Sequence, residues 1–347
     1  MRRVEEPDGL VREASADPGV RIPGGPFTPE AVVKRIPGGG SERLFYRVSE
    51  GRRSAVFLLQ VEGGEELARY VETGDFLRSQ GIPVPEFYDF RPDRGYLVME
   101  DLGGIHLDEE LERSDPDREL AFCRDATDML FRLQTSVTGA MREEGFLEGR
   151  RFGAGELLGE TAYFEREFVR GLARLETPPG WDEERRRLAG EIAGGPEVFM
   201  HRDFQSRNIL VCGGELRVID FQSAFRGPAL YDTASFLKDP YHVLSRGTRK
   251  TLLMELYYRL SETPSFAGCD FRAFERRFVL AGIQRNMQAL AAFAFLGTKM
   301  GKTRFLDSIT PALDLLEEGL EESGAFPVIL DLAKRLRPAT EREGDRQ

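Results

Sequence analysis

The chain has 347 residues, enough for two domains or for one domain of two lobes around a large core. Its 48 basic and 59 acidic residues give a net charge of −11, which argues against a dedicated surface for nucleic acid or for an anionic membrane. The three cysteines lie far apart with no C-x-x-C pair, which argues against a disulfide framework and a zinc site.

Both ends of the chain are rich in charged residues. Residues 1–28 also carry many Gly and Pro, so we expect a flexible arm there and a charged tail over 337–347. No apolar stretch follows the first arginines, and the most apolar segment, from Met287, is too short to span a bilayer. We therefore expect a cytoplasmic protein. We also expect it to be a monomer.

The first part of the chain reads as a small β-rich lobe over residues 29–103. Residues 44–61 hold two β-type runs around a polar turn at Gly51, which is typical of a hairpin. Apolar residues over 64–81 recur at helical spacing before Gly81. The run "GYLVMEDLGG" (95–104) predicts a buried strand that ends at a glycine break.

Helical patterns dominate residues 104–336. Only "NILVCGGELRVIDF" (208–221) interrupts them, as two apolar runs around Gly213 and Gly214. The fold class we predict is therefore α+β, with a small β-rich lobe, a larger helical lobe, and a ligand cleft between them. The helices are predicted over 117–137, 156–175, 248–262, 271–297 and 309–323.

The stretch "HRDFQSRN" (201–208) places Asp203 and Asn208 five residues apart, and Asp220 follows the short β pair. Phosphoryl transfer needs an oriented hydroxyl and a divalent metal, with little covalent help from the protein. Asp203 can accept the proton of an attacking hydroxyl, while Asn208 and Asp220 offer oxygen ligands to Mg²⁺. The alternative is a surface loop followed by a structural hairpin.

The order of "HRD", "RNILV" and "VIDF", followed by "IDFQSAFRGPALYDTASFL" (219–237), resembles the aminoglycoside phosphotransferase (APH) and protein-kinase-like superfamily. With "GIQRNMQALAAFAF" (282–295) and "GKTRFL" (301–306), the chain is most similar to bacterial N-acetylmuramate/N-acetylglucosamine kinases of cell-wall recycling. The resemblance covers roughly residues 35–320 and is strong in the second half. It implies a protein-kinase-like bilobal fold, a nucleotide-binding N-lobe, a C-lobe with the catalytic loop and acceptor site, and ATP and Mg²⁺ as cofactors.

The resemblance also implies roles for single residues. Asp203 would be the catalytic base, and Asn208 and Asp220 the metal ligands. Asp232 would brace the catalytic loop, although capping of the following helix is an equal alternative. His201 invites an acid–base or metal role, but a packed, hydrogen-bonded imidazole is favoured there.

Nucleotide contacts are expected in the N-lobe. Gly38, Gly39, Gly40 and Ser41 let backbone amides approach phosphate, unless this turn is only a flexible connection. Arg43, with Arg47, lies near enough in sequence to supply positive charge. Adenine is expected to meet the backbone at the hinge between the lobes, at Met99, Glu100 and Leu102.

One feature departs from kinase-like enzymes in general. The strand that usually carries a phosphate-clamping lysine has no basic residue over 54–61. The amino-sugar kinases that the chain resembles also tend to lack this lysine, so either an arginine replaces it or the clamp is absent. Glu65, Glu66 and Glu72 then lose a lysine partner and are expected on a solvated helix face.

Acceptor contacts are expected from Gln222, Asp239 and Arg285, with Gln284 and Gln288 one helical turn apart. Arg285 pairing with an acid such as Asp239 is the structural alternative. The leading hypothesis is an ATP-dependent kinase of the anomeric hydroxyl of an N-acetylated amino sugar, with no nucleic-acid or membrane partner. Phosphorylation of an aminoglycoside, choline or homoserine, or a nucleotide- or sugar-sensing pseudokinase, are the alternatives.

Overall fold

The computed structural model describes residues 7–37, 43–60 and 64–344. The chain divides into two compact units, the first formed by 1–105 with 210–222 and the second by 106–209 with 223–347. The first holds the large β-sheet and the second is mainly helical, which confirms the α+β class. The division differs from the expected boundary at 103 because the hairpin around Gly213 belongs to the first unit.

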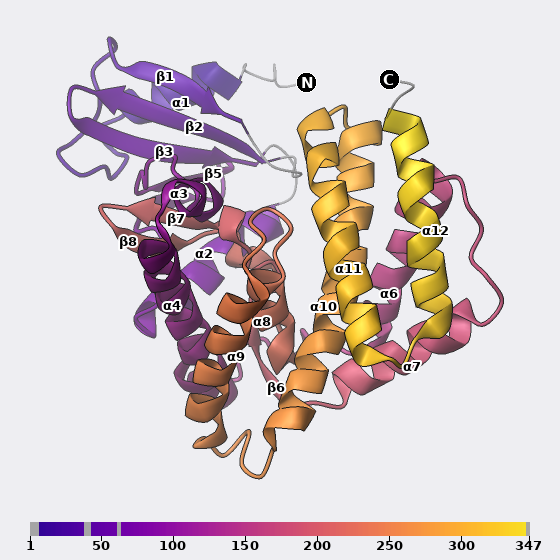
Figure 1. The fold of residues 1–347 in the computed structure, drawn as a ribbon. Helices are drawn as coiled ribbons and strands as arrows, with labels where there is room; N and C mark the ends of the chain where they lie inside the picture. Colours follow the sequence, from indigo (N-terminus) through magenta and orange to yellow (C-terminus); the bar gives the residue numbers. More distant parts are fainter. Residues whose placement is uncertain (1–6, 38–42, 61–63, 345–347) are drawn as a thin grey trace. The chain divides into compact units, whose positions relative to one another are not determined.

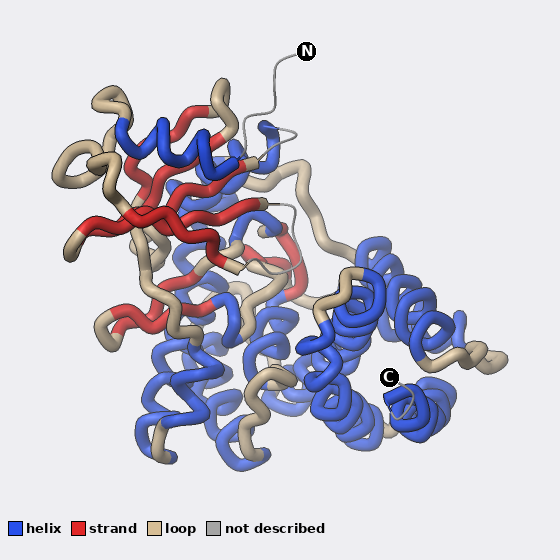
Figure 2. Tube along the Cα trace, turned by 90° about the horizontal axis from the view of Figure 1, so that it is seen from above, coloured by secondary structure: helices blue, strands red, loops and turns tan. Residues whose placement is uncertain are grey.

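The first unit is built on a five-stranded antiparallel sheet in the order β1-β2-β3-β5-β4 (Figures 1 and 2). The expected hairpin forms β2 and β3, and its turn uses Gly51 at φ 60°, a left-handed conformation that favours glycine. Five successive residues of β3, Ala55 to Leu59, are buried. The bounds are β1 Val32–Ile36, β2 Leu44–Glu50, β3 Arg53–Leu59, β4 Phe87–Arg91 and β5 Tyr96–Met99.

The expected flexible arm is wrong for residues 7–28. Residues Pro7–Ala16 form helix α1, and Val11, Ala14 and Phe27 are buried in one cluster with side chains of the sheet. Apolar residues in this Gly- and Pro-rich stretch therefore supply part of the core, which composition alone does not reveal.

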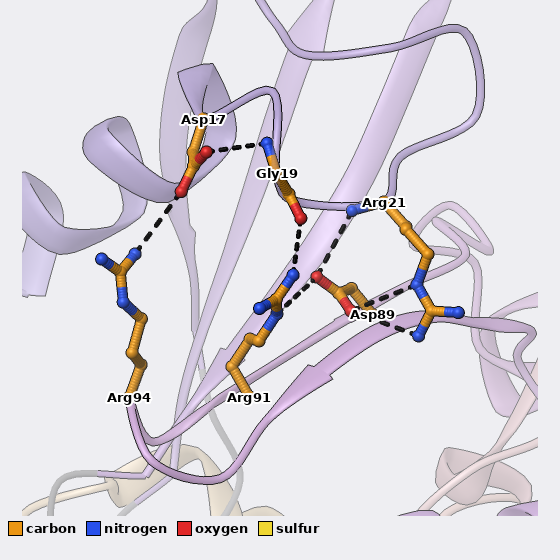
Figure 3. Close-up of polar contacts among 6 residues, drawn as sticks. All are labelled: Asp17, Gly19, Arg21, Asp89, Arg91 and Arg94. Carbon is orange, nitrogen blue, oxygen red and sulfur yellow. Dashed lines mark hydrogen bonds and ion pairs between the residues drawn. The ribbon is translucent and has the colours of Figure 1, made fainter.

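Polar contacts also tie this segment to the sheet (Figure 3). The buried carboxylate of Asp89 on β4 accepts hydrogen bonds from Arg21 and Arg91. Arg91 also donates to the carbonyl of Gly19, and Arg94 lies 3.6 Å from Asp17. These contacts hold Arg21 and Gly19 against β4, which lies about seventy residues later in the chain.

Helix α2 (Gly64–Ser79) and the hairpin of β7 (Ile209–Cys212) and β8 (Glu215–Val218) complete the first unit. Backbone bonds from Val211 to Ile105 and from Val218 to Pro83 join the hairpin to this unit. The Phe221 ring packs 4.7 Å from that of Tyr70 on α2. A Cβ on Gly74 would lie 2.4 Å from Phe87 and 3.0 Å from Phe221, so this glycine permits the close approach.

The second unit is a helical assembly in which α10 packs against α6, α8 and α11 (Figure 1). The five predicted helices are present, and three of them continue as π-helical turns, which explains their expected lengths. The helix bounds in order from α3 to α6 are Leu107–Arg113, Pro116–Arg132, Thr138–Glu144 and Ala154–Phe164. Those from α7 to α12 are Trp181–Ala193, Ala229–Leu237, Arg246–Ser261, Phe271–Ala294, Ile309–Ser323 and Pro327–Gly344.

Some elements of the second unit have no clear sequence signal. The short strands β6 (Glu197–Met200) and β9 (Phe225–Pro228) pair antiparallel and are too short to show an alternating pattern. Helix α12 continues to Gly344, so the expected tail over 337–347 is helical as far as the description extends. Among the described residues, none of the helices has the length and apolar character needed to cross a bilayer.

Candidate active site

The loop over residues 201–208, which the sequence predicts to be the catalytic loop, folds back on its own backbone. The carbonyl of Asp203 accepts hydrogen bonds from the Gln205 amide at 2.9 Å and from Asn208 Nδ2 at 2.8 Å. Asn208 ends a 3₁₀ turn that begins at Ser206. The Asp203 side chain remains 28% exposed, which leaves its carboxylate accessible to a substrate hydroxyl.

Asp232 on α8 holds the start of this loop. Its two carboxylate oxygens accept the amides of His201 at 2.6 Å and Arg202 at 2.8 Å. Arg202 has φ 78°, a strained conformation for a residue with a side chain. Because the N-cap of α8 is Pro228, the capping alternative for Asp232 is wrong. Burial raises the pKa of Asp232 to about 7, against the lowering effect of the two amides.

Asp239 holds the same loop from the other side. One carboxylate oxygen accepts the Ser206 amide at 2.7 Å and the Ser206 hydroxyl at 2.6 Å, and the other accepts the amide of Tyr241. Asp239 is only 2% exposed. The structure therefore differs from the expected acceptor contact, since this carboxylate is used to support the loop.

Arg285 on α10 pairs with Asp203 instead of Asp239. Its Nη1 lies 3.4 Å from Asp203 Oδ1, and its Nη2 donates to Gln205 at 3.1 Å. The residue is 5% exposed and its guanidinium lies over the ring of Tyr231. The sequence predicted a residue of the acceptor site here, and the structure places it directly against the proposed base.

A buried polar network lies behind the loop, and sequence reasoning missed its acid. Glu160 on α6 accepts hydrogen bonds from Tyr231 at 2.7 Å and from Gln284 at 3.2 Å, and lies 3.5 Å from Arg202. Burial raises the pKa of Glu160, which Arg202 and Tyr231 oppose. Gln284 is fully buried, so its expected acceptor role is replaced by a structural one. A lone glutamate inside a helix gives no sequence signal for this.

His201 is fully buried and its ring packs edge-on against that of Phe204. Its backbone amide donates to Asp232. The packed ring agrees with the role favoured from the sequence, whereas a hydrogen bond of the imidazole itself stays a prediction.

The first unit holds Asp220, whose φ of 65° is left-handed. Its Oδ1 accepts hydrogen bonds from Arg43 at 2.7 Å and from Gln222 at 2.9 Å. Gln222 is 6% exposed, so it orients this carboxylate, which differs from the expected contact with an acceptor. Arg43 also lies 3.9 Å from Glu66 on α2, so Glu66 has an arginine partner instead of facing only solvent.

The segment after β5, which the sequence predicts to be the hinge, is fixed by polar contacts. Arg47 donates two hydrogen bonds to Asp101 and one to the carbonyl of Gly103, so it serves the hinge instead of the phosphates. Met99 and Leu102 are buried, and the Glu100 amide donates to the carbonyl of Glu86. Gly38, Gly39, Gly40 and Ser41 lie outside the described residues.

The two proposed metal ligands belong to different units, Asn208 to the second and Asp220 to the first. No group of three His, Cys, Asp or Glu side chains suited to a metal occurs in the described parts of the chain. One amide and one carboxylate nevertheless fit Mg²⁺, which prefers a few protein oxygens together with water and substrate phosphates. Asn208 Nδ2 is bonded to the loop, so its amide oxygen is the atom suited to a metal.

Residues 32–260 match the sequence profile of the family described as "Phosphotransferase enzyme family" (APH). The chain belongs to this family. It is 26% identical to the N-acetylmuramate/N-acetylglucosamine kinase of Pseudomonas aeruginosa over 80% of both chains. It is 28% identical to the protein of the same name from Neisseria meningitidis, over 68% of this chain and 70% of the relative.

Two solved structures show a similar fold. A choline/ethanolamine kinase family protein from Mesorhizobium loti has a TM-score of 0.57 at 15% identity, over 89% of this chain and 93% of its own. The ADP-bound aminoglycoside phosphotransferase APH(2'')-Ib has a TM-score of 0.52 at 13% identity, over 83% and 94%. These likenesses confirm the protein-kinase-like fold of this phosphotransferase.

Proposed function

We propose that this phosphotransferase uses ATP and Mg²⁺ to phosphorylate the anomeric hydroxyl of an N-acetylated amino sugar. The observation that carries the chemistry is the partly exposed carboxylate of Asp203 on a loop that Asp232 and Asp239 hold at two points, the amides of His201 and Ser206. The sugar is supported by the name shared by the curated relatives, at 25–28% identity over at least two thirds of this chain.

In this proposal, Asp203 accepts the proton of the anomeric hydroxyl as the sugar oxygen bonds to the γ-phosphorus. The bond from this phosphorus to the β,γ-bridging oxygen breaks, and ADP leaves with that electron pair. Arg285 holds the Asp203 carboxylate from the side and keeps it directed at the acceptor. The products are a sugar 1-phosphate and ADP.

Asn208 and Asp220 are the residues that would hold the metal, which when bound neutralises charge on the phosphates. Arg43 is proposed as the cation that takes the place of the missing strand lysine. The backbone of Glu100 and Leu102, beside the Met99 side chain, is proposed to meet adenine. Gly38, Gly39, Gly40 and Ser41 remain proposed phosphate contacts.

The experiment is an ADP-release assay with N-acetylmuramate, N-acetylglucosamine, kanamycin, choline and homoserine, each with and without Mg²⁺. We expect turnover with the two sugars only, and a ³¹P resonance coupled to the anomeric proton of the product. Turnover with another alcohol alone would overturn the sugar assignment while leaving the kinase. Nucleotide binding without turnover on any acceptor would favour a sensor.

A further inference from the structure

A pocket of about 430 Å³ lies in the second unit and is lined by Lys238, just after α8, and by residues of α9, α10 and α11. The described residues that line it do not include Asp203, Asn208 or Arg285. Its volume falls within the range of about 300–1,000 Å³ in which proteins hold small organic molecules. It is therefore large enough to be a second binding site.

Two buried cations, Lys238 and Arg249, form the floor of this pocket. Their side chains are 2% and 7% exposed. Arg249 Nη2 donates to Glu318 at 2.9 Å, but Arg249 Nε and Nη1 and Lys238 Nζ have no hydrogen-bond partner among the described residues. The Glu322 carboxylate is 3.7 Å from Lys238 Nζ, which is beyond hydrogen-bond length. Three buried donors are thus left for a ligand.

The fold makes room for the lysine. A Cβ on Gly282 would lie 2.6 Å from Lys238 Cδ, and one on Gly319 would lie 3.6 Å from its Nζ. The ammonium lies 5.3 Å from the centre of the Phe278 ring. A larger residue at Gly282 would therefore clash with the lysine side chain, whereas Gly319 is in ordinary contact with it.

Burial of Lys238 is unfavourable for its charge. Loss of water lowers its pKa, and Glu322 and Glu318 oppose this only in part. A buried cation without good hydrogen bonds is costly, whereas an anion that fills the open donors removes much of that cost. The pocket floor is therefore complementary to a negative group.

The charges around the pocket restrict further which class of ligand it can bind. On the floor, two cations face the single acid Glu318, whereas the rim carries the bases Arg246 and Lys250 with three acids, Glu275, Glu321 and Glu322. We propose that the pocket binds a small organic anion with one carboxylate or phosphate group, which contacts Lys238 and Arg249. The acids of the rim disfavour a second negative charge on the same ligand and suit hydroxyl or amino groups.

The site adjoins the support of the catalytic loop. Lys238 precedes Asp239, whose carboxylate holds the amide and hydroxyl of Ser206. A ligand bound to Lys238 would therefore lie next in sequence to Asp239, which supports the loop. The residues that line the pocket are nevertheless separate from the proposed catalytic residues. The proposal does not depend on the identity of the phosphoryl acceptor.

The test measures the melting temperature of the full chain in the presence of glycerol phosphate or of lactate. The first carries a phosphate group and the second a carboxylate. Chloride is added so that the ionic strength is the same in every sample. We expect a saturable rise in melting temperature with at least one of the two anions. Lys238→Met should abolish the rise and still fold, because Nζ makes no hydrogen bond with the described residues. Lys34→Met, at an exposed residue of β1 outside the pocket, is the matched control and should keep the rise.

Calorimetry with the anion that stabilises the wild type gives a second measurement. Arg249→Lys keeps the charge toward Glu318 but moves the donors, and we expect binding weaker by about 30-fold or more. The proposal is overturned if neither anion gives a saturable shift in the wild type. An equal shift in Lys238→Met would also overturn it, since the effect would then arise elsewhere on the protein.

Discussion

Arg43 donates a 2.7 Å hydrogen bond to Oδ1 of Asp220, the carboxylate proposed to hold the metal. The arginine is 8% exposed and precedes strand β2, whereas the strand β3 that usually supplies a lysine in kinase-like enzymes has none over 54–59. A guanidinium in contact with this carboxylate supplies positive charge from the residue just before β2 instead of from β3. The first unit thus holds a buried cation beside Asp220, and we propose that it serves the phosphates in place of the usual lysine.

Replacement of Arg43 tests this role. Arg43→Met should lower kcat/KM for ATP by about 10- to 100-fold, because the phosphates lose a buried cation. Arg43→Lys should recover part of the loss. The comparison is steady-state kinetics with varied ATP, with Arg52→Met on the exposed turn after β2 as the matched control. Equal kinetics in wild type and Arg43→Met would assign the arginine to structure only.

The base assignment is tested by Asp203→Asn. Turnover should fall by about 100-fold or more, because the amide cannot accept the proton of the acceptor. ATP affinity should stay within about 2-fold, since Asp203 acts on the acceptor side of the reaction. Single-turnover kinetics and nucleotide binding by calorimetry measure the two effects, with the exposed Asp125→Asn as control. Near wild-type turnover would exclude Asp203 as the base.

The buried network behind the loop gives a prediction on stability. Tyr231→Phe removes the 2.7 Å hydrogen bond to Glu160 and leaves a buried carboxylate less well solvated. We expect a loss of about 1–3 kcal/mol in the free energy of unfolding. Tyr258→Phe, at a residue that is 61% exposed, should cost almost nothing in the same urea titration. If the two variants lost equal free energy of unfolding, the hydrogen bond from Tyr231 to Glu160 would contribute little to stability.

Short motifs and helical periodicity predicted much of this molecule. "HRDFQSRN" indicated the loop that carries Asp203 and Asn208, and the periodic segments indicated α4, α9, α10 and α11. These features are local in sequence, so residue spacing reveals them.

Contacts between distant segments were not predictable in the same way. Asp239 was assigned to the acceptor because nothing near it in sequence shows that its carboxylate faces Ser206, 33 residues away. The same holds for Glu160 and Tyr231, which are 71 residues apart. Such partners are fixed by tertiary packing, which one sequence does not encode as a local pattern.

The N-terminal segment is expected to be part of the folded first unit. Phe27 is 3% exposed and Arg53 lies over its ring at 4.9 Å. Phe27→Ala should therefore cost about 3–5 kcal/mol through lost burial and the cavity left behind. Val32→Ala, at a residue that is 62% exposed, is the control. Denaturant titration measures the free energy of unfolding of both variants. If Phe27→Ala lost no more than the Val32→Ala control, the segment would be a loosely held arm after all.

Asp232 makes the stability of the loop depend on pH. Its folded pKa is about 7, because burial raises it, and the ordinary value is 3.8. Between these two values the folded chain holds a proton that the unfolded chain releases, so this contribution to stability is full at low pH and declines as pH rises through 7.

Asp232→Asn has no such proton and also leaves one backbone amide of the loop without an acceptor. The wild-type advantage over this variant should therefore shrink by up to about 1.4 kcal/mol for each pH unit between pH 5 and 7. Urea unfolding of both proteins across this range measures it, and an advantage that stays constant from pH 5 to 7 would mean that Asp232 is ionised throughout in the folded chain as well.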